Sequence, residues 1–277
     1  MAYAKNQGNR HAAAVRPVCL LICWFLFSNG IPAIGEIGAD KFLLGERWKP
    51  LENQFGIFPM IIGSIYVTAG AVLVGVPIGI LCAVFLARFC PPRLHRLLKP
   101  AVDLLAGIPS IVYGFFGLVV IVPLVQSLFG GSGKGILTAS VLLGIMILPT
   151  IISVTEASIR AVPESYYEGA LALGATKERS VFCAVMPGAR SGITAGVILG
   201  TGRAIGETMA VVMVAGNAAV MPDGLLSGVR TLTANIVLEM GYAADLHREA
   251  LIATAVVLFV FILIINLMFS LLKRKEG

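Results

Sequence analysis

Residues 160–190 read RAVPESYYEGALALGATKERSVFCAVMPGAR, a charged segment that lies between two long apolar runs. Pro163 suits the first position of a helix, because proline lacks the N–H that a first turn leaves unpaired. Gly174 is typical of a helix C-terminus, Thr176 of an N-cap, and Pro187 of the point where a helix stops. The segment therefore predicts two short helices joined by a tight glycine turn.

The segments around it carry almost no charge. Five runs contain no Asp, Glu, Lys or Arg: residues 17–35, 53–87, 104–133, 135–155 and 250–272. A sixth run, 191–222, contains two charged residues. A membrane-spanning helix needs about 20 mostly apolar residues, so each run is long enough for one span. The sequence predicts an all-α, polytopic membrane protein with six transmembrane helices.

The composition supports the same class. Hydrophobic residues make up 57% of the 277 residues and charged residues 13%, and the mean hydropathy is +0.91. So few charges would not cover the surface of a soluble domain, and a disordered chain has the opposite balance.

Three of the runs are not simple single helices. Runs 53–87 and 104–133 are longer than one span requires, so re-entrant or interfacial turns are expected in them. Run 17–35 is interrupted by the sequence NGIP at 29–32. No small-residue cleavage site follows it, so we interpret it as a retained span and not as a signal peptide.

The distribution of Lys and Arg predicts the orientation. Of the 21 basic residues, fourteen fall on the side that holds both termini: Lys5, Arg10, Arg16, Arg88, Arg93, Arg96, Lys99, Arg160, Lys177, Arg179, Arg190, Lys273, Arg274 and Lys275. The more basic side faces the cytoplasm, so both termini and residues 160–190 are expected there. The net charge of +6 then reflects topology in a lipid bilayer, with no nucleic-acid partner.

Arg203 and Glu207 are the charged residues inside the fifth run. An ionisable residue in the membrane is costly, and two residues four apart on a helix face each other and can pair. Five further residues fall within about 60° of the same direction at 100° per residue: Gly192, Gly196, Gly200, Gly206 and Asn217. This face is expected to line a translocation path, and tight packing around a structural ion pair remains an alternative.

The third run has a similar pattern. Asp103 and Ser110 share one helical face with Gly107, Gly114 and Gly117. Pro109 frees a backbone carbonyl nearby, because proline has no N–H to donate. The pattern indicates a second polar inner face, and here too packing alone is an alternative.

The chain lacks the signatures of an enzyme. Its five cysteines form no C-x-x-C pair and its three histidines are far apart, which gives no disulfide framework, metal site or cofactor site. The sequence GGSGKG at 130–135 departs from the P-loop pattern, because Leu128 stands where the first glycine belongs. We expect a non-catalytic chain that depends on a partner for any use of ATP.

Within residues 160–190, one pattern resembles the EAA motif of ABC importer permeases, E-A-A-x3-G-x9-I-x-L-P. Four positions match it: Glu168, Ala170, Gly174 and Pro187. Gly169, Ala184 and Met186 depart from the motif but stay small or apolar. The resemblance implies a type I ABC importer permease fold in which this segment is a cytoplasmic coupling helix that docks into an ATPase subunit.

Two other stretches resemble the permease subunits of phosphate importers: LLAGIPSIVYGFFG at 104–117 and GRAIGETMAVVMVAGN at 202–217. The outer stretch FLLGERWKP at 42–50 fits the same pattern. Such importers have two related permease subunits, and the sister subunit lacks the RAIGET run. The resemblance is therefore to the subunit that carries this run. The resemblance implies an ABC importer domain over 56–272, preceded by a first span and outer loop within 1–55 and followed by a basic tail, 273–277.

The resemblance also implies a function: inorganic phosphate crosses a prokaryotic inner membrane through this chain by ATP-driven alternating access. The implied partners are a homologous permease, two ATP-binding subunits and an extracytoplasmic phosphate-binding protein received by the outer loops. Trp48 is expected either to contact that protein or to anchor the membrane interface. The expected substrate path comprises Arg203, Glu207, Ser110, Asp103 and Asn217, and the ATPase-coupling residues are Glu168, Ala170, Gly174 and Pro187.

Other functions remain open on the sequence alone. The chain could be the sister phosphate subunit or a permease for another oxyanion. A proton-coupled secondary transporter would use Glu207, but it predicts internal repeats that are not evident. An intramembrane enzyme would need a nucleophile or a metal set at membrane depth.

Overall fold

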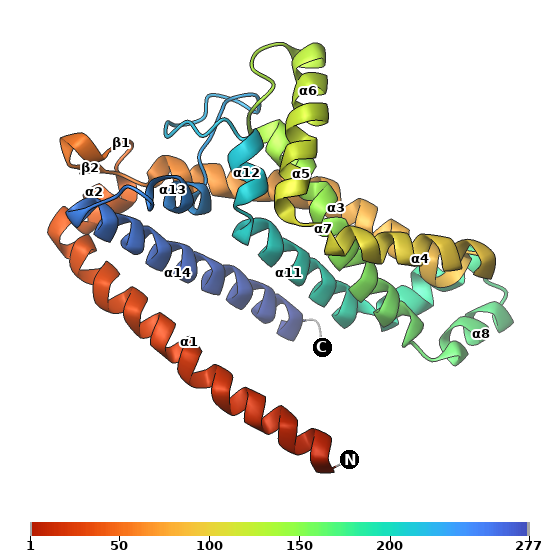
Figure 1. Cartoon of the computed structure of the whole chain (residues 1–277). Coiled ribbons are helices and arrows are strands. Elements are labelled where there is room, and N and C mark those ends of the chain that lie inside the picture. The colour runs from red at the N-terminus through yellow and green to blue at the C-terminus, as the bar shows by residue number, and fades with distance from the viewer. Residues whose placement is uncertain (1, 276–277) are drawn as a thin grey trace.

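The computed structural model describes residues 2–275, and the side chains of residues 17–268. Over this range the chain is helical apart from a small hairpin in which β1 (Trp48–Lys49) pairs antiparallel with β2 (Gln54–Phe55) (Figure 1). Five of the described helices are long and apolar enough to cross a membrane, and a bent pair makes six if it counts as one span. The predicted all-α, polytopic class is confirmed.

Three helices form the centre of the bundle: α3 (Phe58–Val84), α7 (Ile136–Arg160) and α11 (Arg190–Gly206). Glycines let α7 approach the other two closely, because a Cβ at Gly75 would lie only 2.8 Å from the Gly144 carbonyl oxygen. A Cβ at Gly200 would likewise lie 2.7 Å from the side chain of Ile151. The glycine face of α11 therefore points into the bundle, as predicted, and much of it packs against α7.

The first and last helices, α1 (Ala2–Ile37) and α14 (Asp245–Lys275), lie side by side (Figure 1). Helix α1 runs without interruption through residues 29–32, where the Asn29 side chain donates a hydrogen bond of 2.8 Å to the Phe25 carbonyl. The expected first span is thus one helix. The predicted basic tail, 273–277, lies outside the described side chains, and residues 276–277 lie outside the described backbone.

The third predicted run, 104–133, contains one candidate span, Ser110–Phe129, and the end of the helix that precedes it. Helix α4 runs along α7 and α5 packs against the helix after α11, whereas α6 projects away from the central helices (Figure 1). The four elements of this region are α4 (Pro92–Gly107), α5 (Ser110–Phe116), the π-helical turn η3 (Gly117–Ile121) and α6 (Val122–Phe129). The turn expected within 104–133 is the break at Ile108–Pro109, where proline interrupts the helix.

The hairpin end of the bundle is the end that holds β1, β2 and the helix that precedes α14. Helix α2 (Ala39–Leu44), the 3₁₀ turn η1 (Pro50–Glu52) and α13 (Leu232–Glu239) complete it. At the start of run 53–87 the chain forms strand β2, and Phe58–Phe89 is one continuous span, so no re-entrant turn lies within it.

The α8 end is the opposite end of the bundle (Figure 1). It consists of α8 (Glu164–Ala172), α9 (Lys177–Ser180), the π-helical turn η4 (Val181–Val185) and α10 (Met186–Gly188). Gly174 has a φ of 86°, and the Thr176 hydroxyl accepts a hydrogen bond of 3.3 Å from the Arg179 N–H. The predicted pair of short helices with a glycine turn is therefore confirmed.

Both prolines of this segment lie at helix boundaries. Pro163 precedes α8 as its N-cap residue, with extended backbone, one position earlier than the sequence predicts. Pro187 lies one residue before the end of α10, after which the chain bends by 74° into α11.

Candidate functional site

The fifth predicted span is broken where its charged residues lie. Helix α11 ends at Gly206, Glu207 has extended backbone with φ −71° and ψ 135°, and α12 (Met209–Val214) follows. One carboxylate oxygen of Glu207 accepts hydrogen bonds from the N–H groups of Thr208 at 3.0 Å and Ala210 at 3.3 Å. The side chain thus caps the start of α12, where N–H groups lack helical partners.

The predicted Arg203–Glu207 ion pair is wrong. It assumed a continuous helix, and the break turns the Glu207 carboxylate toward α12. The half-buried Arg203 guanidinium instead donates a hydrogen bond of 3.4 Å to the Thr150 hydroxyl of α7. Among the described side chains, no carboxylate forms an ion pair with Arg203.

The break in the third span is stabilised by a residue that sequence reasoning missed. Pro109 has no N–H to donate to the Leu105 carbonyl, and the Tyr113 hydroxyl donates to that carbonyl at 2.9 Å. The Leu105 carbonyl also accepts from the Ile108 N–H at 3.4 Å, so it is not left free. The aromatic residue four positions after Pro109 was the available signal for the Tyr113 contact. Because α4 and α5 are separate helices, Asp103 and Ser110 do not share one continuous helical face.

The two broken spans lie against each other. A Cβ at Gly114 of α5 would lie 2.9 Å from Cα of Ala210 in α12 and 2.8 Å from Sδ of Met213. This contact brings the break at Pro109 and the break at Glu207 to the same region of the bundle. Half-buried Ser110 and Arg203 flank the two breaks.

Asn217 does not belong to this face. It follows α12 in a left-handed conformation with φ 55°, and its side-chain amide donates to the Val212 carbonyl at 2.7 Å. The helical projection placed it beside Arg203 because it assumed a helix through residue 217. The structure gives Asn217 the role of ending α12.

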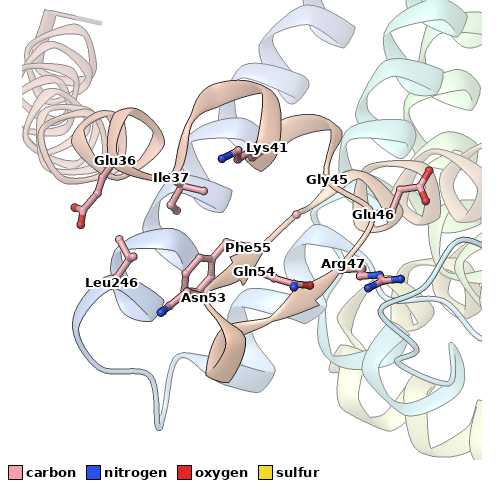
Figure 2. Close-up of a pocket in the computed structure, with 11 residues that line it drawn as sticks. Glu36, Ile37, Lys41, Gly45, Glu46, Arg47, Asn53, Gln54, Phe55 and Leu246 are labelled. Carbon is pink, nitrogen blue, oxygen red and sulfur yellow. The ribbon is translucent and has the colours of Figure 1, made fainter.

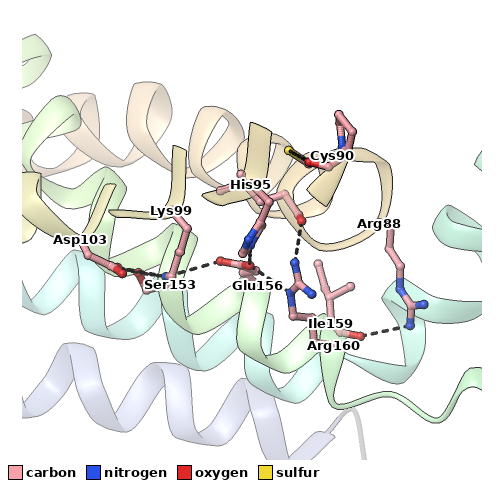
Figure 3. Close-up of polar contacts among 11 residues, drawn as sticks. Arg88, Cys90, His95, Lys99, Asp103, Ser153, Glu156, Ile159 and Arg160 are labelled. Carbon is pink, nitrogen blue, oxygen red and sulfur yellow. Dashed lines mark hydrogen bonds and ion pairs between the residues drawn. The ribbon is translucent and has the colours of Figure 1, made fainter. Parts of the chain in front are cut away.

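Asp103 belongs to a second charged cluster, the Glu156 cluster (Figure 3). Buried Glu156 of α7 lies 2.7 Å from His95 Nε2 and 3.4 Å from Lys99 Nζ, and accepts from Arg160 Nε at 3.0 Å. Asp103 joins it through Lys99 at 3.0 Å and accepts a hydrogen bond of 3.3 Å from Ser153. The cluster ties α4 to α7, and Asp103 takes part in this helix contact.

A third polar cluster closes the hairpin end, around Glu239. This buried carboxylate accepts from Trp48 Nε1 at 2.8 Å and Arg230 NH1 at 2.5 Å, and lies 2.9 Å from His247 Nε2. Trp48 is only 7% exposed, so neither expectation of a surface contact holds for it. Sequence spacing gave no signal for this cluster, since Trp48 and Glu239 are 191 positions apart.

The hairpin end also carries an open pocket of about 700 Å³ (Figure 2). Its walls come from α1, α2, the hairpin and α14. Four charged residues line it: Glu36, Lys41, Glu46 and Arg47. Such a mixed-charge hollow is suited to a polar protein surface.

At the α8 end, the predicted coupling residues lie at the surface. Glu168 and Gly174 are exposed, Ala170 is half-buried, and Pro187 is exposed on α10. Ala170 and Gly174 line a cavity of about 420 Å³, beside which Leu173 is 91% exposed. An exposed leucine beside a hollow is typical of a surface that a partner covers.

Metal ligation has no counterpart in the part of the chain that the structure describes. No group of three His, Cys, Asp or Glu residues there is arranged to hold a metal ion. The five cysteines are free, and none of them is buried: Cys19, Cys82 and Cys183 are exposed, and Cys23 and Cys90 are half-buried.

Comparison with known proteins identifies the family. A model described as the binding-protein-dependent transport system inner membrane component matches residues 75–276. The chain is 38% identical over 277 residues to a protein of Mesorhizobium japonicum named phosphate transport system permease protein PstC, covering 92% of this chain and 84% of that protein. It is 37% identical over 262 residues to a Bacillus subtilis protein named probable ABC transporter permease protein YqgH, covering 91% and 84%.

A solved structure supports the fold. A chain of the inward-facing MetNI methionine ABC transporter is similar with a TM-score of 0.63 and 20% identity, covering 83% of this chain and all of that one. The expected type I ABC importer permease fold is therefore confirmed. The matched proteins are transport permeases, which agrees with the non-catalytic role expected from the sequence.

We expect the Glu239 cluster to be a main source of stability at the hairpin end. Glu239→Gln leaves Arg230 without its carboxylate, and removing one partner of a buried pair costs about 3–5 kcal/mol. The Tm of the purified chain in detergent should fall by several degrees. Glu52→Gln, which breaks the exposed pair of Lys49 with Glu52 at 2.9 Å, is the control. An equal Tm for both variants would contradict the assignment.

Proposed function

The chain belongs to the family of binding-protein-dependent transport system inner membrane components, and on that basis we propose that it is the permease subunit of an ATP-driven phosphate importer. The multi-pass fold and the transport family are established above. The proposal concerns the substrate, the residues that meet it and the partners of the chain.

The observation that carries the substrate proposal is the state of Arg203. Its guanidinium lies near the contact of α5 with α12 and donates to the Thr150 hydroxyl. Among the described side chains, no carboxylate is paired with it. Arginine stays charged and presents a planar fork that matches the oxygens of an oxyanion. Ser110 and Glu207 flank the same region, and the first relative above is named for phosphate transport.

Glu207 acts in this proposal as a positioning residue. Because its carboxylate caps α12, it fixes the angle at which α12 leaves α11. The cap also keeps a negative charge away from the Arg203 guanidinium, where it would compete with a bound anion. Asp103 and Asn217 serve helix contacts and have no place in the proposed path.

The proposed partners are those of an ABC importer. A homologous permease completes the path, and one of two ATP-binding subunits docks on the α8 surface of Glu168, Ala170 and Gly174. An extracytoplasmic phosphate-binding protein docks at the hairpin end, where the mixed-charge pocket of Figure 2 opens. ATP-driven closure displaces 163–187 and switches the bundle between outward-open and inward-open states. Both termini then lie in the cytoplasm, on the side given by the basic residues.

Arg203→Ala should abolish ATP-dependent uptake of labelled phosphate in vesicles that hold the assembled complex. Hydrogen bonds to charged groups contribute about 1.5–3 kcal/mol each, so uptake should fall tenfold or more. Arg203→Lys should retain part of the uptake, because it keeps the charge but loses the fork.

The control for this experiment is Arg93→Ala, which removes an exposed arginine of α4. Sulfate and arsenate added in excess distinguish phosphate from other oxyanions. Normal uptake by Arg203→Ala would contradict the role of Arg203, and stronger inhibition by sulfate than by unlabelled phosphate would contradict the substrate.

Gly174→Leu should release the ATPase subunits from the complex. Gly174 has a φ of 86°, a conformation that costs other residues about 1–2 kcal/mol, and it lies in the proposed docking surface. The yield of co-purified ATPase should fall about fivefold to thirtyfold. Gly131→Leu is matched in strain, with φ 72° in the loop between α6 and α7. If both variants retain the ATPase, the docking surface lies elsewhere.

A further inference from the structure

The cytoplasmic end of α3, at the α8 end of the bundle, is not an ordinary helix end. The π-helical turn η2 (Phe85–Phe89) finishes α3, and two prolines, Pro91 and Pro92, follow it. Since neither proline has an N–H, the carbonyl of Leu86 has no backbone donor five residues on. Arg160 of α7 supplies the missing donor, from NH2 at 2.9 Å.

Arg88, from the same π-helical turn, reaches in the opposite direction. Its NH1 lies 2.7 Å from a carboxylate oxygen of Glu164, the first residue of α8. Its NH2 donates to the Ile159 carbonyl near the end of α7 at 3.5 Å (Figure 3). Its guanidinium also lies 5.7 Å from the ring centre of Tyr167 in α8. One side chain therefore contacts the end of α7 and two positions of α8.

The position of Arg88 suits it to a mechanical link. Its side chain is only 12% exposed, whereas that of Glu164 is 57% exposed. Salt weakens an exposed ion pair such as that of Arg88 with Glu164. The Ile159 carbonyl and the Tyr167 ring also contact the guanidinium, and they are not subject to that screening in the same way. Beneath Arg88 lies an apolar cluster in which Val84 of α3 meets Ile159 and Val162, with Tyr167 packed against the cluster.

Helix α8 makes few other contacts with the bundle. None of its residues is buried, and it touches the bundle mainly through η4 and α9. A displacement of α8 alone would leave α3 unmoved unless a contact joins them. Arg88 joins the start of α8 to α3, and Arg160 joins the end of α7 to the same turn.

We propose that Arg88 is the positioning residue that transmits movement of the coupling helix α8 to the second membrane span, α3, with Arg160 as the reciprocal tie from α7. This inference rests on the proposed function, since it needs ATPase subunits to move α8. Arg88 touches neither substrate nor nucleotide in it. Its role is to make α3, α7 and α8 move as one unit.

The test compares phosphate uptake with ATP hydrolysis in the same vesicles of the whole complex. Arg88→Gln should leave the complex assembled and hydrolysing ATP, with phosphate taken up per ATP lowered about tenfold, as expected for loss of charge-assisted hydrogen bonds. Arg88→Lys should recover part of the ratio, because it keeps the charge without the fork. Glu164→Gln should have a smaller effect, because Glu164 is more exposed.

The control is Arg93→Gln, the same chemical change at an exposed arginine five residues along. A wild-type ratio of uptake to ATP for Arg88→Gln would overturn the inference, and so would a lower yield of complex with that ratio unchanged, which a merely structural role predicts. If wild-type vesicles show no ATP-dependent phosphate uptake, the proposed function fails and the inference fails with it. Normal wild-type uptake together with an unchanged Arg88→Gln ratio overturns the inference alone.

Discussion

The structure depends on how broken helices satisfy their backbone groups in an apolar setting. Each N–H and C=O that loses a helical partner must find another one inside the protein, because lipid offers none. At the first break the Tyr113 hydroxyl donates to the carbonyl of Leu105, and at the second the Glu207 carboxylate accepts from the N–H groups of Thr208 and Ala210 at the start of α12. These contacts satisfy the backbone at two adjoining breaks, one just before the span Ser110–Phe129 and one after α11.

The second of these contacts has a consequence for charge. The Glu207 carboxylate caps a helix and is therefore not available to Arg203, four residues before it. The Arg203 guanidinium thus lies beside the break without that carboxylate as a partner. In the function proposed above, this guanidinium is the group that binds the anion. The link at the α8 end works by the same physics, since Pro91 leaves the Leu86 carbonyl without a backbone donor and Arg160 donates to it.

Much of the fold could be predicted from local sequence. Uncharged runs gave the spans, because their length follows from the thickness of a bilayer. The helices and the turn at the α8 end followed from Gly174 and Thr176, whose preferences act within a few residues. Burial of the glycine face of α11 followed from its period.

The predictions that were wrong had assumed continuous helices. Projection onto one helix paired Arg203 with Glu207 and placed Asn217 beside them, and a single break at residue 207 removed both relations. The break at Pro109 likewise puts Asp103 and Ser110 on separate helices, although the projection had given them one face. The Glu156 and Glu239 clusters join residues 61 and 191 positions apart, so their pairing follows from tertiary packing and not from spacing.

The most direct test of the account is phosphate uptake by complexes that carry Glu207→Gln and Glu207→Ala. A glutamine side-chain oxygen can still accept the two N–H groups of α12, but it brings no charge for Arg203. The account predicts uptake close to wild type for Glu207→Gln and a large loss for Glu207→Ala, with both complexes assembled. Equal loss in the two variants would mean that the negative charge itself is needed, and would contradict the account.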